Sequence, residues 1–212
     1  MIDFSALPWL AAASWLFYGG VHSLLASNKM KNSVAASWPA FTPYYRFLYN
    51  VTAVLLFLLP LSISLADKSP PLWQWRPPLN WLAYGAAILA VAGFIWSLKF
   101  YDMREFAGLP NKNQVKVFEI ARLKISPLHR FVRHPWYFFM LVIIWTREMN
   151  PTQLVSAIVI TLYLVIGSRL EENKLIAQFG DSYRDYRSLI NGLVPLPWKI
   201  LSRSNQAKLL AE

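Results

Sequence analysis

The stretch Asn80–Leu98, NWLAYGAAILAVAGFIWSL, contains 19 residues and no charged side chain. A helix of this length is long enough to cross a hydrocarbon core of roughly 30 Å. Two other blocks, Pro8–Ala26 and Phe47–Ala66, are similar in length and composition. The three stretches predict membrane-spanning helices, and the hydrophobic share of 56% over 212 residues agrees with a membrane protein.

Two further apolar blocks follow, at Tyr137–Met149 and Thr152–Ser168. The first has 13 residues, so a helix there rises only about 20 Å. Asn150 and Pro151 lie between the blocks and form a turn signal. We therefore predict an all-α polytopic membrane protein of about five transmembrane helices, the last two forming a tight hairpin, with a helical tail after them.

The positive charges are distributed unequally among the connecting segments. Residues 27–46, 99–136 and 169–212 carry 18 of the 21 Lys and Arg residues. With five crossings these segments share one side of the membrane, which the positive-inside rule assigns to the cytoplasm. We predict a bacterial inner-membrane protein with the N-terminus outside and the C-terminus cytoplasmic. Basic juxtamembrane segments favour anionic membrane lipids over nucleic acid as partners.

Several classes of chemistry lack their sequence signature. The chain has no cysteine, and its 8 glycines form neither a G-x-G-x-x-G pattern nor a phosphate-binding loop. No metal site is predicted. No internal repeat or domain boundary is visible, so we expect one domain over residues 1–212. Its predicted parts are three helices in 7–99, a cytoplasmic loop at 100–136, the hairpin at 137–168 and the cytoplasmic tail at 169–212.

The motif Arg133-His134-Pro135-Trp136-Tyr137 opens the fourth apolar block. Proline is favoured at the first position of a helix, which places Arg133 and His134 just before a helix N-terminus. Free N–H groups at such a terminus bind carboxylate or phosphate. The alternative is an interfacial anchor in which the arginine meets headgroups and the aromatic residues form a belt.

A second motif, Arg169-Leu170-Glu171-Glu172, leaves the last apolar block. Paired acids at a membrane boundary are costly unless they are solvated or paired. They can bind ribose hydroxyls or an amine, or accept a proton. The alternative is ordinary capping and ion pairing.

The third motif runs from Phe179 to Tyr186 and reads FGDSYRDY. Gly180 is placed to end one helix, and Asp181 or Ser182 to cap the next. We expect a short amphipathic helix here, and a helix lying on the membrane surface is the plainer interpretation.

Together, RHPWY, the hairpin and EENKLIAQFGDSYRDYRSLINGLVPLPW resemble the isoprenylcysteine carboxyl methyltransferase and phospholipid N-methyltransferase superfamily. The N-terminal segments GGVHSLLASNKMKN, YYRFLYN and FYDMREFAGL resemble its bacterial branch of methanethiol S-methyltransferase-like and NnrU-like proteins. The residues before Arg133 and after Tyr137 depart from the superfamily pattern, and these differences bear on the acceptor more than on the cofactor.

The resemblance implies an S-adenosylmethionine-dependent membrane methyltransferase acting on a small-molecule or lipid-like thiol, carboxylate or amine. Arg169 would orient the acceptor, and Glu171 or Glu172 would hold the ribose or amine. We count Arg169, Glu171 and the intramembrane residue His22 as predicted catalytic residues. The predicted cofactor-binding residues are Arg133, His134, Pro135, Tyr137, Glu171, Glu172, Tyr183 and Tyr186.

Four alternatives remain open. His22 could be an interfacial histidine bonded to a carbonyl, and Asp102 could orient a substrate or be simply solvated. The whole chain could be a non-catalytic assembly or sensing protein that keeps the methyltransferase fold. A small transporter is the fourth, although transporters tend to have repeated halves and charges within their spans.

Overall fold

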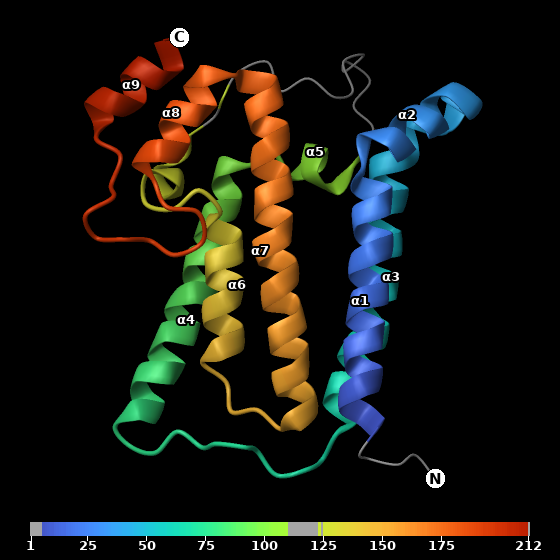
Figure 1. Ribbon diagram of the computed structural model, residues 1–212, viewed down its shortest axis with the longest axis vertical. Helices are drawn as coiled ribbons and strands as arrows, with labels where there is room; N and C mark the ends of the chain where they lie inside the picture. Colours follow the sequence, from blue (N-terminus) through green and yellow to red (C-terminus); the bar gives the residue numbers. More distant parts are fainter. Residues whose placement is uncertain (1–5, 110–122, 124, 212) are drawn as a thin grey trace. The chain divides into compact units, whose positions relative to one another are not determined.

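The computed structural model describes residues 6–109, 123 and 125–211 (Figure 1). Regular structure in this part of the chain is helical throughout, as predicted. The predicted cytoplasmic loop at 100–136 lies partly outside the described residues. The helices are α1 (Leu7–Ala26), α2 (Asn28–Ser37), η2 (Pro39–Tyr44), α3 (Tyr45–Ala66), α4 (Leu79–Ser97), η3 (Leu98–Phe100), α5 (Met103–Ala107), η4 (Pro127–Arg130), α6 (Pro135–Trp145), α7 (Pro151–Phe179), α8 (Asp181–Leu189) and α9 (Arg203–Ala211).

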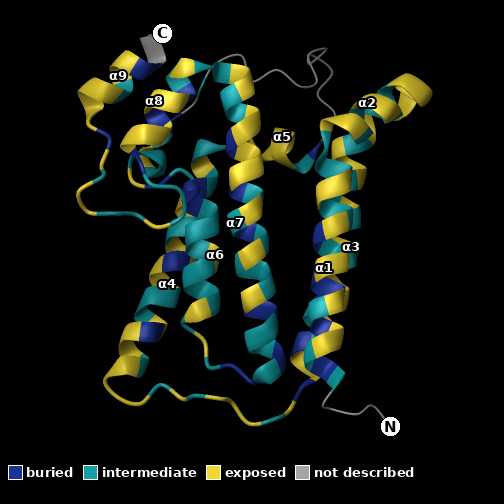
Figure 2. Ribbon diagram, in the orientation of Figure 1, coloured by how far each residue is buried: buried dark blue, intermediate teal, exposed yellow. Residues whose placement is uncertain are grey.

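Three helical stretches are long and apolar enough to cross a membrane: Pro39–Ala66, Leu79–Phe100 and Pro151–Phe179. Exposed residues occur along the whole of α4 and along α7 from Ile158 onward (Figure 2), as expected for helices whose apolar side chains meet lipid. The chain is therefore an integral membrane protein. Helix α6 is apolar but shorter, and α1 is not among the three stretches, so the count of five spans stays a prediction.

The chain divides into two compact units, of which the first comprises Met1–Trp75, Tyr101–Val117 and Glu148–Ile160. Its main feature is the pair α1 and α3, which lie side by side (Figure 1). Trp15 of α1 packs edge-on against Phe57 of α3, with ring centroids 5.5 Å apart. The first turns of α7 join this unit through polar contacts.

The second unit comprises Arg76–Phe100, Phe118–Arg147 and Thr161–Glu212. Here α6 lies closest to α4, because Gly93 of α4 leaves room for the ring of Phe139. Trp136 also donates a 2.7 Å hydrogen bond to Ser97 at the end of α4. Side-chain contacts also join α6 to α7, as expected for the predicted hairpin, such as the 3.0 Å bond from Trp145 to Thr161.

Helix α7 continues to Phe179, well beyond the predicted end at Ser168. Gly180, with φ of +59°, ends it as predicted. The prediction that Asp181 or Ser182 caps the next helix is wrong, because α8 begins at Asp181 and no side chain caps it. The Asp181 carboxylate instead accepts a 2.6 Å bond from Arg184.

Helices α8 and α9 pack on a small hydrophobic core of their own. Its centre is formed by Tyr183, Tyr186, Ile190 and Leu201, each at most 3% exposed. The Tyr186 hydroxyl donates to the carbonyl of His129 at 2.7 Å. The tail is thereby fixed against the segment that leads into α6.

Candidate functional site

The RHPWY motif leads into α6 as predicted, with Pro135 as its first residue and His134 just before it. The loop after α8 holds this entry in place through two backbone bonds. Arg133 N–H donates to the Asn191 carbonyl at 2.9 Å, and His134 N–H donates to the Gly192 carbonyl at 3.0 Å. Segments almost 60 residues apart in sequence therefore form one wall of the site.

Arg133 forms a buried ion pair with Glu172 of α7. Its Nη2 and Nε lie 2.7 and 2.8 Å from Oε1 of the carboxylate. Its Nη1 donates to the carbonyls of Arg187 and Ile190. The guanidinium therefore joins α7 to the end of α8, and each of its three nitrogens has a partner.

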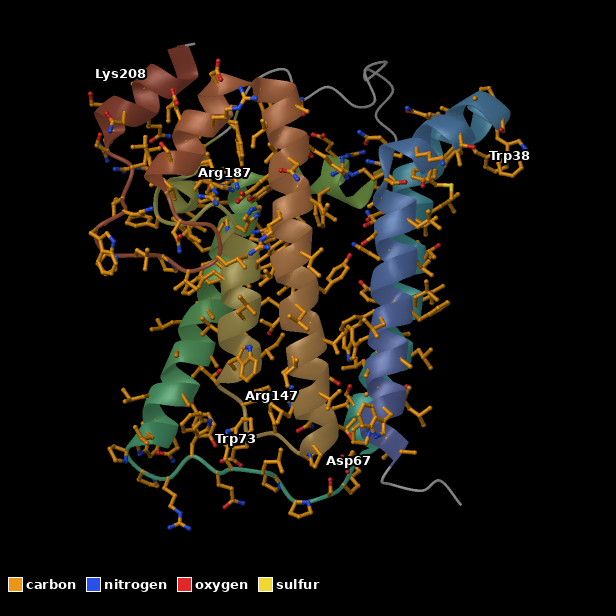
Figure 3. The ribbon with its side chains drawn as sticks, viewed as in Figure 1. Trp38, Asp67, Trp73, Arg147, Arg187 and Lys208 are labelled. Atoms are coloured by element: carbon orange, nitrogen blue, oxygen red, sulfur yellow. The ribbon has the colours of Figure 1, made fainter. Side chains whose placement is uncertain are left out.

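Glu172 is bound from two further directions. His134 Nε2 lies 3.1 Å from Oε1, and Arg187 Nε from α8 lies 3.2 Å from Oε2. Figure 3 labels Arg187 on α8. Only 5% of the Glu172 side chain is exposed, so the surrounding cations and imidazole replace its hydration. This carboxylate is a structural centre that fixes Arg133, His134 and Arg187.

Glu171 lies in a much more exposed environment than Glu172, because successive residues of a helix point about 100° apart. Its side chain is 51% exposed, and its Oε2 lies 3.5 Å from His134 Nδ1. The Tyr137 hydroxyl donates to the same oxygen at 3.3 Å. The Tyr137 ring stacks on His134 with centroids 5.2 Å apart and planes 11° apart. The predicted proximity of His134, Tyr137 and Glu171 is confirmed.

Two residues of this arrangement were not identified from sequence. Arg187 lies four residues after Tyr183, one helical turn along α8, which was the available signal. Gly192 lies close to the ion pair, because a Cβ there would lie 3.2 Å from Arg133 Nη2 and 3.7 Å from Glu172 Oε1. A side chain at this position would press on the guanidinium, so a glycine suits the place where the loop passes over the ion pair.

The other predicted site residues lie in different surroundings. The Arg169 side chain is exposed and makes no hydrogen bond or ion pair with the described part of the chain. Tyr183 and Tyr186 are buried in the α8–α9 core, next to the ion pair rather than on the exposed surface of Glu171. Burial raises the pKa of the Tyr183 hydroxyl, and the nearby Glu172 charge adds to this shift.

His22 and Asp102 belong to the first unit. His22 Nε2 and the Tyr49 hydroxyl are joined by a 2.7 Å hydrogen bond. Asp102 caps α5, accepting from the N–H groups of Arg104 and Glu105 at 3.0 and 3.1 Å.

The exposed part of the arrangement can bind a zwitterionic ligand. Glu171 offers a half-exposed carboxylate oxygen that accepts from a hydroxyl or an ammonium group. The start of α6 provides N–H groups and the positive end of a helix, which suit a carboxylate. Tyr137 adds an aromatic face between them.

Comparison with known proteins found relatives that are named as methyltransferases. The methanethiol S-methyltransferase of Pseudomonas deceptionensis is 30% identical over 188 residues, which cover 82% of this chain and 67% of that protein. Methanethiol S-methyltransferase 1 of Bradyrhizobium diazoefficiens is 29% identical over 82% of this chain and 62% of its own length. The Mycobacterium tuberculosis enzyme of the same name is 29% identical over 83% and 73%.

The chain thus belongs to the family of the methanethiol S-methyltransferases. It spans about two thirds of the length of these relatives. No family model matches the chain. No solved structure matches it either.

Proposed function

We propose that this protein transfers a methyl group from S-adenosylmethionine to a small thiol at or within the membrane. The observation that carries the proposal is a pair of neighbouring carboxylates on α7 that contact the residues at the start of α6. Glu172 is buried, and Glu171 is exposed. The first fixes the geometry and the second is left to meet a ligand. The relatives, named for a thiol acceptor, support a thiol over a carboxylate or an amine.

The donor set fits this cofactor. S-adenosylmethionine supplies a methyl group already activated on a positively charged sulfur. Its amino acid part suits the N-terminus of α6 beside His134, and its ribose hydroxyls or its amine suit Glu171. It carries no phosphate, so a glycine-rich phosphate loop is not needed. Arg133 and Arg187 act indirectly, because both are held by Glu172.

The work left to the protein is mainly positioning. Alignment of a donor and an acceptor can account for a large part of a rate enhancement. A thiol must also lose its proton before or during the attack of its sulfur on the methyl carbon. A cation stabilises a thiolate by lowering the thiol pKa. Arg169, which is exposed and lies two residues before Glu171 on α7, is our proposed partner of the acceptor.

Isotopic labelling tests the proposal directly. Purified protein in detergent would receive S-adenosylmethionine with a deuterated methyl group and a panel of small thiols, carboxylates and amines, and mass spectrometry would follow the label. We expect label in thiols, and a rate reduced at least about tenfold in Glu171→Gln through the loss of a charge-assisted bond.

Glu105→Gln is the matched control, because Glu105 is also 51% exposed and also lies 3.5 Å from its cationic partner, Arg46. Its rate should equal that of the wild type. Cofactor binding without labelling of any acceptor would favour the non-catalytic alternative. Equal loss in both variants would show that Glu171 has no special role.

A further inference from the structure

The first unit contains an apolar groove of about 380 Å³ at the end where α1 leads into α2. This volume is within the range of roughly 300–1,000 Å³ that is typical of small-ligand sites. The walls come from α1, α2, η2 and α3, and include Leu25, Val34, Phe41, Tyr45, Leu48 and Thr52.

The groove exists because the chain folds back after α1. The Ser27 hydroxyl caps α2 by accepting from Met30 N–H at 3.2 Å. The Tyr45 hydroxyl donates to the Leu25 carbonyl at 2.6 Å, which ties the start of α3 to the last turn of α1. An ordinary lipid-facing helix is convex, whereas these contacts produce a concave apolar surface.

The polar ends of the lining tyrosines are already engaged. Tyr45 is bonded to Leu25, and Tyr49 to His22 at 2.7 Å. The surface left for a ligand is therefore almost wholly apolar. Such a surface matches a hydrocarbon chain better than a polar metabolite.

The charge around the groove has one sign. Residues 7–52, which include every wall of the groove, contain no Asp or Glu. Lys29 and Lys31 lie on α2, and Lys29 is exposed. Arg46 is paired with Glu105 of α5 at 3.5 Å, so that acid is already engaged. Helix α2, which contributes Val34 to the groove, thus carries positive charge that a negative group can neutralise.

We propose that the groove binds one anionic phospholipid, with an acyl chain against Leu25, Val34 and Leu48 and the phosphate near Lys29. The aromatic residues agree with this depth in the membrane. Trp38, at the end of α2 (Figure 3), and Phe41 are 63% and 57% exposed. Tryptophan in particular collects at membrane interfaces, where headgroups and acyl chains meet. A lysine there attracts anionic headgroups.

Native mass spectrometry of the delipidated full chain in detergent tests the acyl-chain part. The probes are phosphatidylglycerol and phosphatidylcholine with identical chains. We expect the wild type to retain one phosphatidylglycerol in preference to phosphatidylcholine. Thr52→Trp, which fills the groove, should abolish this retention. Val54→Trp is the matched control, because Val54 lies on the same helix, is 61% exposed and does not line the groove.

Lys29→Gln tests the headgroup part. One lysine near an anionic surface corresponds to about a fivefold change in binding, so this variant should lose about fivefold of the preference for phosphatidylglycerol. Lys68→Gln replaces an exposed lysine beyond the other end of α3 and should leave the preference unchanged. Because Lys29 is exposed, this variant should fold even if Thr52→Trp does not.

Three outcomes would overturn the proposal. The first is equal retention of both lipids by the wild type. The second is equal loss of retention in Thr52→Trp and Val54→Trp. The third is an unchanged headgroup preference in Lys29→Gln. All are independent of methyl transfer, since the groove belongs to the first unit and the candidate site to the second.

Discussion

Glu172 is the residue on which most of the candidate site depends. Its carboxylate accepts from Arg133, His134 and Arg187 while 5% of its side chain is exposed. Replacement by Gln keeps the shape and removes the charge, which leaves the buried Arg133 guanidinium uncompensated. We predict that Glu172→Gln lowers the free energy of unfolding by about 3 kcal/mol. Thermal or denaturant unfolding in detergent measures this loss.

Glu171→Gln is the comparison for that prediction. Glu171 is half-exposed, and its contacts to His134 and Tyr137 are long. Solvent screens such a charge, so the stability should change by less than about 1 kcal/mol. Equal destabilisation by the two variants would contradict the division into a structural and a ligand-facing carboxylate.

His129 gives a prediction for pH. Its ring is partly buried, with Nδ1 2.7 Å from the Ser126 hydroxyl, and burial together with the nearby His134 lowers its pKa from 6.5 to about 4. Between these values the unfolded chain binds a proton that the folded chain does not. The free energy of unfolding should therefore fall as the pH decreases from 6.5 to 4, by roughly 3 kcal/mol at most.

A pH series of unfolding curves checks this dependence, with His129→Gln as the reference. In the variant, the free energy of unfolding should change less steeply between pH 4 and 6.5, because the contribution of His129 is removed. Identical slopes in both proteins would mean that His129 is not buried in its neutral form.

At the scale of elements, the contact between α4 and α6 depends on one glycine. A Cβ on Gly93 would lie 2.7 Å from the Phe139 ring, whereas a Cβ on Gly85 of the same helix meets nothing within 4 Å. We predict that Gly93→Val costs about 1–3 kcal/mol more stability than Gly85→Val, because only the first overpacks the contact. Phe139→Leu should recover part of the loss, and its failure to do so would place the strain elsewhere.

The helices that can be predicted from sequence are those whose ends carry local signals. Pro135 begins α6 and Gly180 ends α7 as expected, because proline and glycine act through their own backbone geometry. Apolarity alone places the end of α7 too early, at Ser168, because the apolar block stops there while the helix continues. The polar residues after it include good helix formers such as Glu172 and Lys174.

The contacts of the site were harder to predict. Both carboxylates were identified from the EE pair, but sequence could not say which one is buried. That depends on Arg133 and Arg187, which arrive from other elements. Gly192 could not be identified from sequence for the same reason. The side chain that approaches it closely belongs to Arg133, 59 positions away.

At the scale of the whole molecule, the distribution of charge predicts the orientation in the membrane. With 18 of 21 Lys and Arg residues in three connecting or terminal segments, we expect these segments in the cytoplasm. A reporter active only in the cytoplasm should be active when fused after Glu212 and inactive when fused before Met1. The reverse pattern would contradict the orientation, and equal activity at both ends would contradict the odd number of crossings.

Cofactor binding tests the central claim most directly. Isothermal titration of the purified full chain with S-adenosylhomocysteine, the demethylated product of the cofactor, should give about one site per chain. Glu171→Gln should weaken binding at least about tenfold, while Glu105→Gln, with its equally exposed carboxylate, should bind as the wild type does. Absence of binding by folded wild-type protein, or wild-type affinity in Glu171→Gln, would contradict the account.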